Sequence, residues 1–164
     1  MHNFIFGIYP YIALSVLVLG SIARYERDPF TWKSSSSQLL RRKQLVIGSV
    51  LFHVGVLVIF FGHLVGLLTP IAVFDALGIG HGFKQVIAIL VGGVAGIMAL
   101  VGGIMLFHRR RTDPRIRQTS SFADLAILAL LIVQLVLGLA PIIVSLQHLD
   151  GQEMTTFMSW ALGI

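Results

Sequence analysis

The sequence predicts an all-α integral membrane protein built as a transmembrane helical bundle. Of its 164 residues, 56% are hydrophobic and only 12% are charged, whereas a soluble domain carries about 25% charged residues. Four apolar stretches are each long enough for the roughly 20 helical residues that cross a bilayer. These observations exclude an ordinary soluble domain and a disordered chain. The absence of cysteine excludes disulfides, iron–sulfur clusters and thiol catalysis within this chain.

The four expected spans cover residues 3–22, 44–68, 85–107 and 122–146, and together they form one transmembrane domain. Runs such as LVIGSVLFHVGVLVIFFGHLVGLL do not alternate as the strands of a membrane barrel do. The first span starts at Met1 without a basic leader, and no small-residue cleavage signal follows it. We therefore expect a retained helix and not a signal peptide.

Basic residues gather in two of the connecting loops, and by the positive-inside rule those loops are cytoplasmic. The orientation that follows places both termini outside the cytoplasm. Eleven of the twelve Lys and Arg residues lie in these loops: Arg24, Arg27, Lys33, Arg41, Arg42, Lys43, Arg109, Arg110, Arg111, Arg115 and Arg117.

Glycines on the third span predict close helix packing. Gly92 and Gly96 give a G-x-x-x-G spacing together with Gly93, and Gly102 and Gly103 follow one to two turns later. Small residues of this kind let two membrane helices approach closely.

Two histidines lie well inside a span, a rare and costly placement that marks functional candidates. His53 and His63 are ten residues apart on the second span, so a helix separates them by ~15 Å along its axis and ~80° around it. Neutral imidazole is an axial ligand of haem iron, and two depths suit two haems that carry electrons across the bilayer. Alternatively, each histidine hydrogen-bonds to a neighbouring helix or to a buried water.

The surroundings of the two histidines bear on the haem hypothesis. We expect Gly55 and Gly62 to clear space for a flat macrocycle, and the arginines at 109–111 to neutralise haem propionates in addition to setting topology. Two haems held by histidine pairs need four imidazoles, so two must come from elsewhere. The remaining histidines are not well placed for this: His2, His81, His108 and His148.

Lys84 stands directly before the third span, on the expected outer side and near the depth of His63. A lone interfacial cation can hold the oxygen of a quinol head group, or it can be a helix-end lysine that reaches to the interface. The loop 69–83 is a candidate lid over such a site, and its Asp75 is either a local acid or a solvated charge.

Four segments resemble the cytochrome b gamma subunit of respiratory nitrate reductase. They are IYPYIALSVLVLGSIARY, TWKSSSSQLLRRK, LFHVGVLVIFFGHLVGLLTP and QHLDGQEM. The resemblance runs in order from Tyr9 to about Trp160. The span with paired histidines and the TWxxxSSQxxxRK loop are its specific parts.

The resemblance implies a five-helix anchor in the cytoplasmic membrane of a prokaryote, with two b-type haems. Such subunits oxidise ubiquinol or menaquinol near the outer haem and pass electrons inward to an iron–sulfur beta subunit and a molybdenum-containing alpha subunit. By position, His53 ligates the inner haem and His63 the outer one. Lys84 matches the quinol-site lysine, Gly62 the neighbour of the outer ligand, and Arg110 a basic residue near the inner haem's propionates.

The chain departs from the family pattern after its fourth span. The family's fifth helix carries the two opposing haem histidines, and this chain stops at Ile164 before it. The chain is then either a fragment of a longer gene product, which we expect, or a natural short variant. Two alternatives stay open. One is a quinone-linked cytochrome b subunit of a sulfite- or heterodisulfide-type reductase, and the other is a haem-free membrane anchor in which the two histidines only pack.

Overall fold

A computed structural model describes residues 2–31, 37, 39–147 and 149–163. Most of the TWKSSSSQ segment and His148 lie outside the described residues. The described parts contain helices and no strand, and four helices are long and apolar enough to cross a membrane. The predicted fold class is thereby confirmed. The chain divides into two units, Met1–Ser34 with Gly163–Ile164, and Ser35–Leu162.

The first unit is one long helical segment. A π-helical turn, η1 (Phe4–Ile8), leads into α1 (Tyr9–Arg27), and a 3-10 turn, η2 (Pro29–Thr31), follows. The helix extends five residues beyond the predicted end of the first span at residue 22. Basic side chains in this last turn suit the negative end of the helix dipole, so the helix continues where the apolar residues end.

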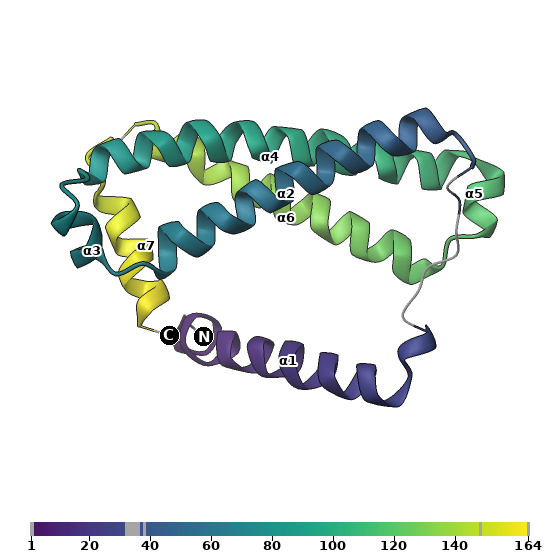
Figure 1. The fold of residues 1–164 in the computed structure, drawn as a ribbon, viewed down its shortest axis with the longest axis horizontal. Coiled ribbons are helices and arrows are strands. Elements are labelled where there is room, and N and C mark those ends of the chain that lie inside the picture. The colour runs from purple at the N-terminus through teal and green to yellow at the C-terminus, as the bar shows by residue number, and fades with distance from the viewer. Residues whose placement is uncertain (1, 32–36, 38, 148, 164) are drawn as a thin grey trace. The chain divides into compact units, whose positions relative to one another are not determined.

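Three long helices build the second unit, and α4 (His81–Thr112) is its centre. The helices α2 (Arg42–Leu68) and α6 (Phe122–Ser145) each pack against α4 in up-and-down order (Figure 1). The predicted limits of α2 and α6 are within two residues of those observed. The predicted span 85–107 was too short by four residues at its start and five at its end, because polar residues prolong the helix at both ends.

Short helices lie at the two ends of this bundle (Figure 1). At the end where α2 stops and α4 starts lie α3 (Ile71–Ala76) and α7 (Gln152–Leu162), and we call this the α3 end. At the opposite end, the α5 end, lies α5 (Pro114–Gln118). The sequence pattern predicts no helix after residue 146, yet α7 packs against α2 and α4. With 11 residues it is too short to span a bilayer.

Glycines set the close approach of α2 and α4. A Cβ added at Gly55 would lie 2.5 Å from the Ala95 carbonyl oxygen, and one at Gly102 would lie 2.5 Å from the Phe52 nitrogen. Gly96 meets Leu139 of α6 in the same way, at 2.6 Å. The prediction of packing glycines is therefore confirmed for Gly96 and Gly102. A Cβ added at Gly92 has nothing within 4 Å among the described residues, so for Gly92 close packing stays a prediction.

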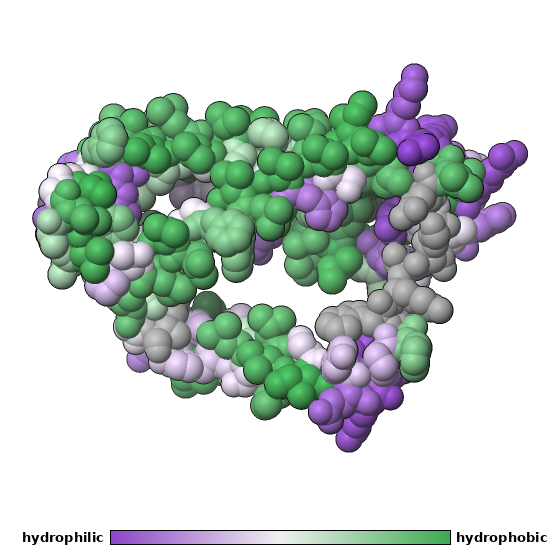
Figure 2. Space-filling model, in the orientation of Figure 1, coloured by the Kyte–Doolittle hydropathy of each residue, from purple (hydrophilic) through white to green (hydrophobic). Residues whose placement is uncertain are grey.

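The surface of the bundle separates apolar from polar regions along the helices. Figure 2 shows hydrophobic side chains over the middle of α2, α4 and α6, and hydrophilic ones gathered at the α5 end. Large apolar residues such as Leu90, Val94 and Leu130 are exposed. Apolar faces of this extent are stable in lipid and not in water.

We predict that Gly102→Ala destabilises the helical bundle by about 1–3 kcal/mol, because the new methyl group overlaps the backbone of α2. The matched control is Gly92→Ala on the same helix, which meets open space and gains helix propensity. Thermal unfolding of the detergent-solubilised protein measures both. Equal melting temperatures for the two variants would contradict the packing role of Gly102.

Candidate functional site

His53 lies on an exposed face of α2, with one ring nitrogen fixed by its own helix. Its Nδ1 lies 2.7 Å from the Ser49 carbonyl oxygen and 3.2 Å from the Ser49 hydroxyl. A carbonyl only accepts hydrogen bonds, so Nδ1 carries the proton. The neutral ring then keeps its lone pair on Nε2, at the outer edge of the imidazole.

His63 repeats this arrangement ten residues later on the same helix. Its Nδ1 lies 2.8 Å from the Ile59 carbonyl oxygen, again one helical turn back, and the ring is exposed. Metal-bound histidines commonly donate their second ring N–H to a carbonyl, which fixes the tautomer and the ring orientation. Both imidazoles are therefore prepared to bind a metal through Nε2 from the side of α2 that the described helices leave exposed.

The sequence predicts that Gly55 and Gly62 leave space beside the two histidines, and the structure agrees for only one of these glycines. A Cβ added at Gly62 would have no heavy atom within 4 Å, and the same holds for Gly66, one turn after His63. The surface of α2 is therefore smooth there. The expectation for Gly55 was wrong. This glycine is buried against Ala95 and Ala99 of α4, and its missing side chain allows helix packing and leaves no room for a macrocycle.

The donor chemistry of this face fits haem better than a protein-only metal centre. No group of three or more His, Cys, Asp or Glu side chains that could hold a metal ion is found in the described part of the chain. A porphyrin supplies four nitrogen ligands itself and requires only axial imidazoles from the protein. Single histidines at two depths, each with a free Nε2, suit such a group.

Lys84, near the start of α4, joins three helices at the α3 end. Its Nζ donates to the Gly66 carbonyl oxygen at 3.2 Å and to the Met158 sulfur at 2.7 Å, and it lies 3.7 Å from the centre of the Phe74 ring. Carbonyls in the last turn of a helix lack partners within the helix, so the ammonium stabilises the end of α2. The contact with Gly66 also places Lys84 one turn from His63.

Gln85 beside it fastens α7 to the bundle, a role that the sequence analysis missed. The side chain is 3% exposed, donates to the Ser145 carbonyl oxygen at 3.1 Å and accepts from the Gly151 nitrogen at 2.8 Å. Gly151 has a φ of +83° and contacts His81, a position that only glycine fills without strain. The sequence feature that could have revealed this role is a polar residue next to Lys84 at the start of a span.

An ion pair at the same end links α3 to α4. The Nε2 of His81 lies 3.2 Å from the Asp75 carboxylate. Among the described residues, its other ring nitrogen, Nδ1, is buried and has no hydrogen-bond partner. The loop 69–83 therefore contains a short helix held by two contacts, Phe74 with Lys84 and Asp75 with His81.

Arg109 is buried at the α5 end and holds the segment that precedes α2. It is 1% exposed, and its guanidinium donates to the Ser37 hydroxyl at 3.2 Å and to the carbonyl oxygens of Ser37 and Leu40. Arg41, which follows Leu40 in the sequence, adopts a left-handed conformation with φ 44°, and its Nε lies 3.0 Å from the Asp113 carboxylate. The buried guanidinium thereby fixes the start of α2.

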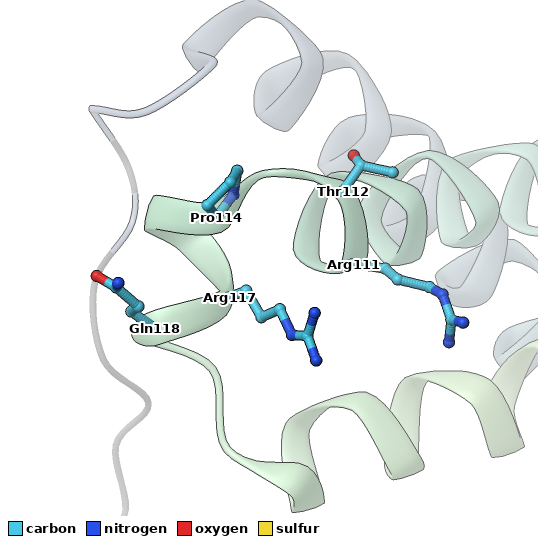
Figure 3. A pocket seen from close by; sticks show the side chains of 5 residues that line it. All are labelled: Arg111, Thr112, Pro114, Arg117 and Gln118. Atoms are coloured by element: carbon cyan, nitrogen blue, oxygen red, sulfur yellow. The ribbon is translucent and has the colours of Figure 1, made fainter.

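The neighbouring arginines are arranged differently. Arg110 lies 3.7 Å from Asp124, whose carboxylate also completes the capping box of α6 with Ser121. Arg111 and Arg117 line a shallow pocket with Thr112, Pro114 and Gln118 (Figure 3). In Figure 3 both of these arginine side chains extend on the side of α5 that faces the start of α6.

Comparisons with known proteins show the family of the chain. The family described as "Nitrate reductase gamma subunit" matches residues 2–164. The respiratory nitrate reductase 1 and 2 gamma chains of Escherichia coli (strain K12) are 44% and 45% identical over 164 residues, which is 100% of this chain and 72% of each relative. The nitrate reductase gamma chain of Bacillus subtilis (strain 168) is 40% identical over 156 residues, covering 95% of this chain and 70% of the relative.

We predict that Arg109→Gln destabilises the protein by about 2 kcal/mol, because two backbone carbonyls lose their charged donor. Arg111→Gln, at the exposed position two residues on, is the matched control and leaves stability within about 0.5 kcal/mol. Detergent-based thermal unfolding compares the two. Indistinguishable variants would show that the Arg109 contacts do not stabilise the start of α2.

Proposed function

Because the chain belongs to the nitrate reductase gamma subunit family and is a membrane subunit of that oxidoreductase complex, we propose that it is the cytochrome b subunit that oxidises quinol. In this proposal two b-type haems are held at two depths, and electrons leave toward the iron–sulfur and molybdenum subunits. The observation that carries it is the matched state of His53 and His63, each with Nδ1 bound to a backbone carbonyl and with no hydrogen-bond partner for Nε2 within the described part of the chain.

The two histidines would hold one haem each, His53 the inner and His63 the outer. Haem b, when bound, accepts and passes on single electrons. The chain contributes the ligand geometry: the carbonyls of Ser49 and Ile59 orient the rings and leave Nε2 of each ring to face a ligand. Gly62 leaves the surface beside His63 open for a flat group. Among the described residues of α2, each depth has one imidazole, which would be one axial ligand of each haem.

The quinol head group is expected at the α3 end, between Lys84 and His63. Lys84 already donates to the carbonyl oxygen of Gly66, and exchanging this acceptor for a quinol oxygen requires only rotation of the lysine side chain. An ammonium at this position holds the oxygen and favours its deprotonated form during oxidation. The reacting group would thus lie beside the outer of the two electron acceptors.

The orientation and the partner contacts follow from charge. The basic residues at the α5 end predict that this end is cytoplasmic and that the N-terminus is outside. The family adds the expectation that the membrane is the inner membrane of a prokaryote. The α5 end would then face the beta and alpha subunits. Arg110, beside the first turn of α6, is the candidate for an inner haem propionate, with Asp124 as the acceptor it would partly release.

His63→Ala is expected to remove one b-type haem from the assembled complex and to abolish quinol-driven nitrate reduction. His53→Ala is expected to remove the other haem. A dithionite-reduced minus oxidised spectrum of the membranes measures both. His108→Ala, on an exposed position at the α5 end of α4, is the control and retains both haems. Unchanged spectra in both site variants would show that the two histidines do not bind haem, and would favour a haem-free membrane anchor in which they only pack.

Lys84→Met is expected to slow quinol-driven nitrate reduction roughly tenfold or more, since a charge-assisted hydrogen bond contributes about 1.5–3 kcal/mol. Both haem signals are expected to remain. Reduction driven by a viologen dye, which needs no quinol, serves as the internal reference. Lys43→Met, at an exposed site in the first turn of α2, is the matched control. Full quinol-driven turnover in Lys84→Met would remove this lysine from the quinol site.

A further inference from the structure

Residues from three other helices hold the side chain of Lys84. Its Nζ donates to the Gly66 carbonyl oxygen of α2 at 3.2 Å and to the Met158 sulfur of α7 at 2.7 Å. The same atom lies 3.7 Å from the centre of the Phe74 ring of α3. The position of the ammonium therefore depends on three separate segments of the chain.

Two of these partners bind the ammonium without neutralising its charge. A thioether is a weak acceptor, and an aromatic ring attracts a cation through its electron-rich face. Within the described part of the chain, no salt bridge joins Lys84 to a carboxylate. A carboxylate at this place would compete with a quinol oxygen for the ammonium, whereas Phe74 and Met158 leave its charge available.

Met158 is held in place by contacts other than the one with Lys84. Its side chain is 1% exposed, and it is the residue that α7 buries among those described. The buried Gln85 accepts a hydrogen bond from the Gly151 nitrogen at 2.8 Å, directly before α7 begins. The sulfur therefore stays near the start of α4 when the lysine exchanges another of its partners.

Phe74 is held by the residue that follows it. The Asp75 carboxylate lies 3.2 Å from the Nε2 of His81, the first residue of α4. Because Phe74 and Asp75 are consecutive in the short helix α3, this contact keeps the ring near Lys84. Both α3 and α7 are thus attached to α4 by contacts that do not involve the ammonium.

An unrestrained lysine at the end of a membrane helix extends toward water. Its four-carbon chain is flexible, and long basic side chains at such positions reach to the polar region. The apparent affinity of a site falls with the fraction of molecules in which the site is competent to bind. Contacts that keep the ammonium beside Gly66, one turn from His63, therefore increase the affinity for a ligand that binds there.

We propose that Phe74 and Met158 are positioning residues of the quinol site, an inference that rests on the function proposed above. They keep the Lys84 ammonium beside the last turn of α2 while a quinol oxygen replaces the Gly66 carbonyl oxygen as its third partner. Neither side chain takes up a proton or an electron. Both act on the binding of quinol, through Lys84.

The test measures KM and kcat of quinol-driven nitrate reduction by the assembled complex in membranes, with tetramethylbenzoquinol as the substrate. Phe74→Leu removes the aromatic face, and Met158→Leu removes the sulfur at nearly constant volume. We expect each variant to raise KM roughly threefold to tenfold, which is the effect of one weak contact with a cation. We expect kcat, viologen-driven turnover and both haem spectra to stay unchanged.

Two further variants separate contact with the ammonium from packing. Phe74→Tyr keeps the aromatic face and is expected to keep the wild-type KM. Phe157→Leu changes an exposed residue next to Met158 on α7, and this matched control is also expected to keep the wild-type KM. A Phe74→Tyr variant with the same raised KM as Phe74→Leu would overturn the role assigned to the ring.

The remaining outcomes separate the two levels of the proposal. A wild-type KM in both leucine variants would overturn the positioning role and leave the quinol site standing. A lower kcat or a lost haem signal at unchanged KM would also overturn it, because the two side chains would then only support the fold. Absence of haem or of quinol-driven turnover in the wild-type complex would overturn the proposed function itself.

Discussion

The close contact between α2 and α4 is the constraint on which the candidate site depends. Gly55 and Gly102 let the two backbones approach so closely that neither position accepts a methyl group without a shift. This contact fixes the rotation of α2, because the face that carries Gly48 and Gly55 is buried. His53 and His63 are consequently exposed, on the side that remains available to a cofactor or another helix.

Each end of this helix pair is stabilised by a long basic side chain that satisfies backbone carbonyls. Arg109 does so before α2 begins, and Lys84 does so in its last turn. Unpaired carbonyls at a helix end are costly at the edge of the hydrocarbon region, where water is scarce. Arg109, one of the charges that indicate membrane topology in the sequence, and Lys84, which lies outside that set, therefore both hold the histidine-bearing helix in place.

Hydropathy and residue type predicted the long helices but not their ends or their tertiary contacts. The limits of α2 and α6 were predicted closely because apolar composition and helix length coincide there, whereas α4 continues through Arg109 at one end and His81 at the other. Gly55 was misjudged because proximity in sequence to His53 does not reveal which helix face it lies on. α7 was missed because its 11 residues lack a membrane-length apolar run, and because its attachment through the buried side chains of Gln85 and Met158 joins segments far apart in the sequence.

The two ends of the bundle differ in their balance of basic side chains. At the α5 end arginines predominate, beside Lys43 and His108, and they serve as fixed charges in the pairs Arg41–Asp113 and Arg110–Asp124. At the α3 end stand a lysine and a histidine, the basic side chains that exchange protons most readily near neutral pH. The proposed quinol site thus lies at the end that carries Lys84, and α2 presents His53 and His63, the proposed axial ligands, between the two ends.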